Sequence, residues 1–153
     1  MHQLTPDDCV SVGSLLPYTA LALIREIGAE AACALLNARA GVTFVVPMSA
    51  TGNVFGAARW VNLAALIGDE AMATLAAKRG GQPLSVPVCK TARDELRARK
   101  IRAEYDRLTA GGLSGRQAVY EICLCFSPIT SRAVEMICSR GDQNPERQQE
   151  LPL

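Results

Sequence analysis

Three polar residues, Ser131, Arg132 and Glu135, carry hydrogen-bonding groups of the kind that proteins use to contact the edges of DNA bases. Their spacing predicts that they share one side of a short helix, because positions three or four residues apart face the same way. The other side of this helix carries apolar residues at helical spacing, namely Ala133, Val134, Ile137 and Cys138. A small helix with one buried and one polar side fits the major groove of DNA, and we therefore expect the three polar side chains to reach base edges.

Four nearby residues are candidates for contacts with DNA phosphates: Arg97, Lys100, Arg116 and Thr130. The first two belong to a longer helix that the pattern predicts from Thr91 to about Leu108. Its basic side is extended by Arg93 and Arg107, and its apolar side consists of Leu96, Ile101, Tyr105 and Leu108. A charged helix that simply faces water is the alternative interpretation of this pattern.

Capping residues delimit two short helices in a helix-turn-helix pattern. Ser114 and Gln117 have the spacing of a capping box, so the first helix is expected to begin there and to run to Phe126. Pro128 interrupts the pattern, since a residue before proline disfavours the helical conformation. Thr130 is the expected N-cap of the second helix. An ordinary helical hairpin without a nucleic-acid partner is the alternative interpretation.

Positive charge is concentrated in the same part of the chain. Residues 88–140 hold ten Lys and Arg against six Asp and Glu, a net charge of +4, whereas the whole chain of 153 residues carries only +1. Residues 1–87 hold five basic against six acidic residues. This distribution favours a local nucleic-acid contact over a protein that coats nucleic acid with its whole surface.

Catalysis and metal binding find little support in the sequence. The single histidine is His2, so a cysteine nucleophile would lack a histidine partner. The six cysteines are Cys9, Cys33, Cys89, Cys123, Cys125 and Cys138, and no two of them are separated by two residues as zinc-ligand pairs often are. Most of them are expected to be buried thiols on apolar helix faces, including that of the helix that begins at Ser114. We therefore expect a protein that is not an enzyme and that has no metal and no cofactor.

Thiols without disulfide partners are typical of the reducing cytoplasm. The N-terminus carries Asp7 and Asp8 instead of the basic region of a signal peptide. The apolar stretch from Leu15 to Leu36 contains Arg25, Glu26 and Glu30, which argues against a membrane span. These observations predict a cytoplasmic protein without membrane contact.

The first half of the chain contains a repeat. Residues 23–47 match residues 63–87 at a constant offset of 40 positions, with ten of 25 positions identical, including the motif Ile-Gly-x-Glu-Ala at Ile27 and Ile67. Such a repeat predicts a duplicated supersecondary unit. Each copy is expected to contain a helix that ends near Gly41 or Gly81, followed by a short strand, and Met48–Arg59 is expected to be a linker.

The strand of the first copy consists of Val42, Thr43, Phe44, Val45 and Val46, and that of the second of Leu84, Ser85 and Val86. A strand this short is not stable alone, and an apolar strand edge invites association. The two copies could pair with each other or with the same segments of a second chain. We expect the strand of the first copy to contribute to a homodimer.

The order of these motifs resembles the Mor transcription activators, the middle-operon regulators of Mu-like phages and prophages. The resemblance is carried by Ile-Gly-x-Glu-Ala, a glycine and short strand ending in proline, the basic segment Arg99–Asp106, and the Ser-initiated helix pair. It covers Leu63–Ser139, with Leu23–Pro47 as a further copy of the family's first half. The resemblance implies a homodimer with an N-terminal dimerisation region and a C-terminal DNA-binding region, and an activator that recruits host RNA polymerase.

The sequence therefore predicts a mainly α protein with a small β element. Residues 1–87 form a helix-strand dimerisation region, residues 88–140 a basic helix with a helix-turn-helix, and residues 141–153 a flexible tail. The expected function is sequence-specific regulation of transcription by a homodimer bound to double-stranded DNA. The alternative is a dimeric protein-interaction module that keeps the fold but has lost DNA binding.

Overall fold

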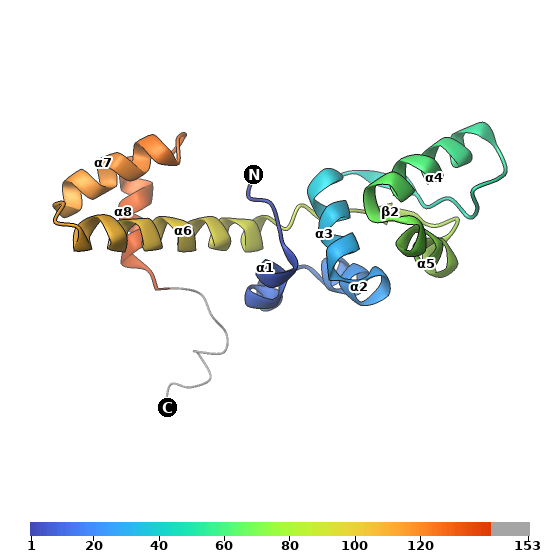
Figure 1. Ribbon diagram of the computed structural model, residues 1–153, viewed down its shortest axis with the longest axis horizontal. Helices are drawn as coiled ribbons and strands as arrows, with labels where there is room; N and C mark the ends of the chain where they lie inside the picture. The colour runs from blue at the N-terminus through green and yellow to red at the C-terminus, as the bar shows by residue number, and fades with distance from the viewer. Residues whose placement is uncertain (142–153) are drawn as a thin grey trace, which may run out of the picture. The chain divides into compact units, whose positions relative to one another are not determined.

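A computed structural model of the chain describes residues 1–141, and the predicted tail 141–153 lies outside the described residues except for Gly141. The fold is mainly helical with one two-stranded antiparallel sheet, as predicted (Figure 1). In chain order the elements are α1 (Pro6–Ser11), the short 3-10 helix η1 (Gly13–Leu15), α2 (Tyr18–Ile27), α3 (Ala29–Ala38), β1 (Thr43–Val45), α4 (Val54–Ile67), α5 (Asp69–Arg79), β2 (Pro83–Ser85), α6 (Lys90–Ala110), α7 (Gly115–Cys125) and α8 (Ser131–Ser139).

The chain divides into two compact units. The first contains Gln3–Ala92 together with Met1, and the second contains the described residues from Arg93 onward together with His2. The first unit holds both copies of the repeat and the sheet, and the second holds most of α6 with α7 and α8. No helix within residues 1–141 combines the length and the apolar character that crossing a membrane would require.

The two copies of the sequence repeat have the same order of secondary-structure elements. Each copy consists of two helices joined at a glycine, then a turn and a strand: α2, α3 and β1 in the first copy, α4, α5 and β2 in the second. The joining residues Gly28 and Gly68 have φ/ψ of 87°/158° and 92°/156°. Only glycine adopts this conformation without strain, which explains why the motif Ile-Gly-x-Glu-Ala occurs at the same place in both copies.

Several other identities of the repeat are core positions. Leu35 and Leu75 are completely buried, Leu23 and Leu63 are buried, and so are Val46 and Val86. The helices of the two copies pack together: α2 lies against α3 and α5, and α4 lies against α5 and α3. The apolar side chains of each copy are therefore buried partly by the other copy.

The two strands pair with each other within the chain, in the register Thr43 with Ser85, Phe44 with Leu84 and Val45 with Pro83. Four backbone hydrogen bonds flank this ladder: Gly41 N to Val86 O and Gly81 N to Val46 O, both 2.8 Å, and Val86 N to Val42 O and Val46 N to Gln82 O, both 2.9 Å. If every residue is exchanged for its counterpart 40 positions away, this set of bonds maps onto itself. The first unit thus has a pseudo-two-fold axis between Phe44 and Leu84.

Intrachain pairing answers the question that the sequence left open. The first strand is shorter than predicted, since Val42 and Val46 lie just outside β1, and the second is shifted by one residue, since β2 includes Pro83 and ends before Val86. Because β2 supplies the partner of β1, a second chain is not needed to pair this strand. The homodimer stays a prediction, without the unpaired strand that motivated it.

Two local predictions need correction or addition. The linker predicted for Met48–Arg59 is wrong beyond Asn53, because the Asn53 side chain caps α4 by accepting a hydrogen bond from Gly56 N at 2.7 Å. Helix α1 was not predicted, although its signals are present in the sequence: Thr5 is the N-cap, Pro6 is the first helical residue, and Asp8 completes a capping box.

The glycine joints give the first test. At Gly28 and Gly68 a Cβ would meet no described atom within 4 Å, so alanine introduces backbone strain without a clash. We expect Gly28→Ala and Gly68→Ala each to lower the free energy of unfolding by about 1–3 kcal/mol. Urea denaturation followed by Trp60 fluorescence reports on this unit, because Trp60 is the only tryptophan of the chain.

Gly13→Ala is the matched control. A Cβ at Gly13 also meets no described atom within 4 Å, but its φ lies outside the left-handed region. Its expected effect is within about 0.5 kcal/mol. Equal stability of all three variants would show that the joints tolerate an L-residue.

Candidate nucleic-acid interface

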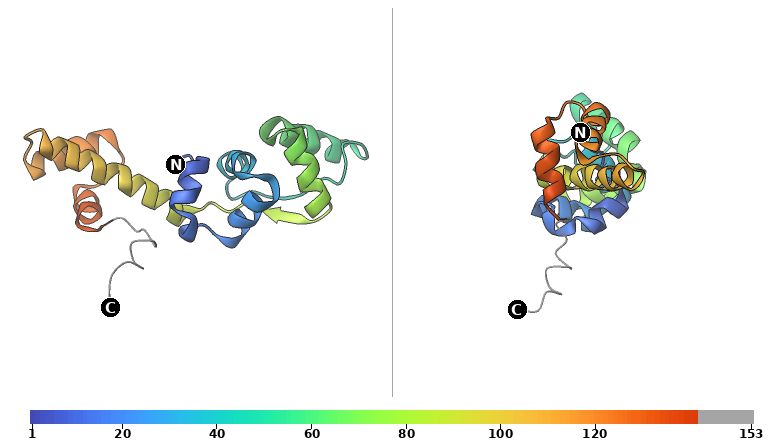
Figure 2. Two further views of the ribbon diagram at one scale, coloured as in Figure 1. Left: turned by 60° about the horizontal axis from the view of Figure 1, so that its bottom comes forward. Right: turned by 90° about the vertical axis from the view of Figure 1, so that its left-hand side faces the viewer.

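The second unit is organised around one side of α6. Ile101 is fully buried in a cluster with Val119 and Ile122 of α7 and Val134 of α8. Half-buried side chains surround this cluster: Tyr105, Leu108, Cys123, Phe126, Ile129, Ile137 and Cys138. Figure 1 shows α7 and α8 gathered at the C-terminal end of α6, and they remain together there in two further views (Figure 2). Three helices therefore share one core, which orients α8.

The capping residues lie where the sequence predicts them. The Ser114 hydroxyl accepts a hydrogen bond from Gln117 N at 3.2 Å, and α7 begins at the next residue. The Thr130 hydroxyl accepts one from Ala133 N at 3.1 Å, and α8 likewise begins at the next residue. Ile129, just before this cap, packs against the shared core. Both helices thus begin at capped residues, and Thr130 with Ile129 holds the end of the turn that leads into α8.

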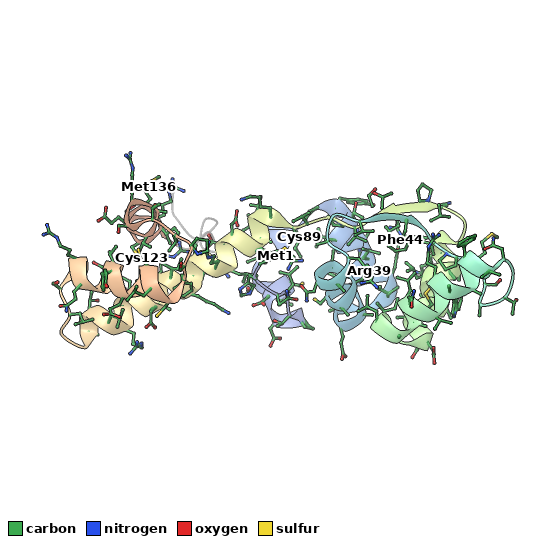
Figure 3. The ribbon with its side chains drawn as sticks, turned by 90° about the horizontal axis from the view of Figure 1, so that it is seen from above. Met1, Arg39, Phe44, Cys89, Cys123 and Met136 are labelled. Atoms are coloured by element: carbon green, nitrogen blue, oxygen red, sulfur yellow. The ribbon has the colours of Figure 1, made fainter. Side chains whose placement is uncertain are left out.

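The nine residues of α8 separate into a buried and an exposed side. Val134 is fully buried, and Ala133, Ile137 and Cys138 are half-buried, as predicted. The candidates for base contacts, Ser131, Arg132 and Glu135, are all exposed, and so are Met136 and Ser139. Figure 3 shows Met136 on the outer side of α8. The structure thus brings the three base-contact candidates together on one accessible face.

The first helix of the pair follows its predicted pattern less closely. Ala118, Val119 and Ile122 are buried, but Cys125, expected on the apolar side, is exposed. Its outer side also carries Tyr120 and Leu124, which are 60% and 58% exposed. Large apolar side chains at such exposure make this side of α7 less polar than a solvated helix face.

The phosphate candidates differ in what their side chains do. Lys100 and Arg116 are exposed to solvent. Arg97 is half-buried and donates a hydrogen bond from Nη2 to the carbonyl oxygen of Phe126, the C-cap of α7, at 2.7 Å. The Thr130 hydroxyl is engaged as the N-cap of α8. Thr130 therefore has the capping role that its position predicts, and Arg97 has a structural role that its position on the basic side did not indicate.

Ion pairs account for much of the remaining charge on α6. Glu95 is buried and accepts hydrogen bonds from Arg99 at 3.2 Å and Arg102 at 2.8 Å. Arg102 also approaches the carbonyl oxygen of Ile137, in the last turn of α8, at 3.5 Å. Like Arg97, it thus places a cation at the C-terminus of a neighbouring helix, where the helix dipole is negative.

The first and last basic residues on this side of α6, Arg93 and Arg107, also make contacts within the chain. Arg93 is buried and donates a hydrogen bond to the carbonyl oxygen of His2 at 2.6 Å. Arg107 pairs with Glu104, with 3.0 Å between Nε and Oε2, and this hydrogen bond lowers the pKa of the Glu104 carboxyl. The predicted basic face of α6 is therefore largely a set of intramolecular contacts, and Lys100 and Arg107 are its exposed members.

A groove of about 400 Å³ lies where α6, the first turn of α7 and α8 meet. Arg116, a phosphate candidate, and Glu135, a base-contact candidate, both line it, although they come from different helices. The groove also contains Cys138, and burial, followed by the nearby Asp106, raises the pKa of its thiol. The thiol is therefore protonated at neutral pH, which makes it a poor nucleophile.

A larger groove in the first unit does not suit a nucleic acid. It measures about 790 Å³ and is lined by both copies of the motif Ile-Gly-x-Glu-Ala. Its charged lining residues are all acidic: Glu26, Glu30, Asp69 and Glu70. Three of these carboxylates lie in the first turns of α3 and α5, where they stabilise the helix N-termini. Phosphate groups would be repelled here.

The residues predicted as a dimer strand lie in the first unit. Thr43 and Val45 are exposed, Phe44 is half-buried, and all three pair with β2.

No group of three or more His, Cys, Asp and Glu within residues 1–141 is arranged to hold a metal ion. The candidate interface of the described chain is therefore the exposed face of α8 with Lys100 and Arg116.

The contact between Arg97 and the end of α7 gives the second test. Arg97→Ala removes a charged donor from a helix C-terminus and is expected to lower the free energy of unfolding by about 1–3 kcal/mol. Amide hydrogen exchange at the C-terminal turn of α7 should become faster. Lys100→Ala, on the same helix but exposed, is the control and should change stability by less than about 0.5 kcal/mol. If amide exchange in α7 were unchanged in Arg97→Ala, Arg97 would not stabilise this helix, and its predicted contact with a DNA phosphate would be favoured.

Comparisons of the chain with protein-family models, with curated proteins and with solved structures found no match. The resemblance to the Mor activators therefore stays a prediction based on the motifs of the sequence.

Proposed function

We propose that the protein is a sequence-specific DNA-binding transcription regulator. The observation that carries this proposal is the exposed face of α8, where Ser131, Arg132 and Glu135 stand together while the opposite side of the helix is buried. A helix of nine residues is about 13 Å long, and the major groove of DNA admits an α-helix. Because the opposite side of α8 is buried against α6 and α7, only its exposed face would contact the DNA.

Each candidate residue has a chemical role in this proposal. Arg132, in the first turn of α8, presents two parallel donors to O6 and N7 of a guanine. Ser131 accepts or donates at a neighbouring base, and Glu135 accepts from the amino group of a cytosine. Lys100 and Arg116 contact phosphates, which positions α8 without reading sequence. Arg97 and Thr130 contribute mainly by holding α7 and α8.

The finer parts of the proposal are supported by the sequence resemblance alone. The chain would act as an activator of the Mor type, of phage or prophage origin, in the cytoplasm, and would recruit host RNA polymerase. A homodimer belongs to the same proposal. Because β1 is paired with β2 in the chain, its interface would have to use a surface other than the paired side of this strand.

A protein-interaction module is the second candidate. It is favoured by the exposed apolar side chains Tyr120 and Leu124 on α7 and Met136 on α8. Base-reading surfaces are mainly polar, whereas exposed apolar side chains are typical of protein contacts. In this alternative the second unit keeps its fold and binds a protein through these side chains.

Selection of sites from random duplex DNA with the full chain separates these proposals. Enrichment of a sequence supports the regulator, and the symmetry of that sequence tests the homodimer. A two-fold-symmetric site indicates two copies, and a non-symmetric site indicates that one chain binds alone. No enrichment, with the fold intact, would overturn the regulator in favour of the interaction module.

The third test compares a proposed base contact with a proposed phosphate contact. Arg132→Ala should weaken binding to the enriched site by about 1–3 kcal/mol more than binding to random duplex, because it removes a base contact. Lys100→Ala should weaken binding to both duplexes alike and reduce the salt slope by about one unit, because it removes a phosphate contact. Affinities are measured over a series of salt concentrations. Equal losses on both duplexes for Arg132→Ala would reassign Arg132 to the DNA backbone.

A further inference from the structure

Two buried cysteines of the first unit face each other. The Sγ atoms of Cys9 on α1 and Cys33 on α3 are 3.3 Å apart, although the residues are 24 positions apart in the chain. The residues are only 6% and 4% exposed. Both are reduced in this structure. Two thiols at this separation need only a small side-chain movement to form a bond of about 2.05 Å.

Specific contacts bring the two thiols together. The side chain of Asn37 accepts a hydrogen bond from Leu4 N and donates one to Leu4 O, each 2.9 Å long, which ties the segment before α1 to α3. Val12 and Leu16, which follow α1, are buried. The capping box of Thr5 and Asp8 fixes the start of α1. Cys9 therefore meets Cys33 as a consequence of how α1 docks.

The contact is a feature of the first copy of the repeat. The counterpart of Cys33 in the second copy is Ala73, which is exposed. The counterpart of Asn37 is Ala77, also exposed. The side of α3 that α1 covers thus corresponds to a bare side of α5 with small side chains, so the thiol pair is an addition to the duplicated unit.

We propose that Cys9 and Cys33 are a modification site, a dithiol that small-molecule disulfides convert into an intrachain disulfide. One protein thiol loses its proton, and the thiolate attacks a sulfur of the small disulfide, forming a mixed disulfide and releasing one small thiol. The second protein thiol then loses its proton and attacks the protein sulfur of the mixed disulfide, which releases the other small thiol. The small disulfide gains two electrons, the two protein thiols lose them, and no other oxidant is needed.

The position of Cys9 supplies the access that this reaction needs. It lies on a helix of only six residues near the N-terminus, the kind of element that opens locally without unfolding the domain. Once formed, the disulfide prevents this opening and lowers the conformational entropy of the unfolded chain. Oxidation should therefore stabilise the first unit as a whole.

The other cysteines differ in surroundings. Cys89 is buried and its thiol approaches the carbonyl oxygen of Pro87, Cys123 lies near the hydroxyl of Ser131, and Cys125 is exposed. Cys125 is therefore expected to form a mixed disulfide that stays accessible to reducing agents. In Cys9 and Cys33, by contrast, two sulfur atoms lie in contact.

The test treats the full-length protein with oxidised glutathione, blocks the remaining thiols with an alkylating agent, and maps the peptides by mass spectrometry. We expect a peptide pair linked through Cys9 and Cys33. The melting temperature of the first unit, followed by Trp60 fluorescence, should rise by roughly 5–15 °C. Cys33→Ala and Cys9→Ala should abolish both the link and the rise. Cys125→Ala, which removes an exposed thiol, should keep both.

Two results would overturn the proposal. One is glutathione bound at Cys125 without any link between Cys9 and Cys33 in the folded protein. The other is a link that forms equally fast in urea, since the fold would then contribute nothing to it. Circular dichroism shows whether the alanine variants are folded, and the linked peptide of the unmodified sequence tests the proposal even if they are not.

Discussion

The first unit is built around the pairing of its two short strands, each of which supplies the hydrogen-bond partners of the other's backbone. A three-residue strand has too few hydrogen bonds and too little apolar surface to persist alone. Here the second copy of the repeat supplies the missing partner, and the pattern of bonds is the same from either side of the pseudo-two-fold axis. Burial of Leu35 and Leu75 follows from the same symmetry, because the helices of one copy pack on those of the other.

Because the two strands pair within one chain, the duplicated unit does not need a second subunit to complete its sheet. An apolar strand that reads as an exposed edge in the sequence is a paired strand in the structure, so its hydrophobicity no longer calls for a second subunit. The copies are also unequal in their continuation: β1 leads through residues 46–53 to α4, whereas β2 leads to α6. Within residues 1–141, a helix pair of the α7–α8 kind follows only the second copy.

The second unit shows how one helix can serve two purposes. The apolar side of α6 buries Ile101 against α7 and α8, and its arginines reach the C-terminal carbonyl groups of the same helices. These contacts hold α7 and α8 against α6, and the exposed face of α8 is left to whatever partner the protein binds. The positive charge of this region is therefore partly structural, because several of its arginines hold the helices together.

The sequence alone determined the local features of this protein. The caps Ser114 and Thr130, the two sides of α8 and the repeat were all predictable, because each depends on residues a few positions apart or on direct identity. Tertiary structure decided the rest. Whether β1 pairs with β2 or with another chain, whether Arg97 faces solvent or a carbonyl group, and whether Cys9 meets Cys33 all depend on contacts between distant segments. Residue type and helical spacing limit which side chains share a face, but only packing decides what that face meets.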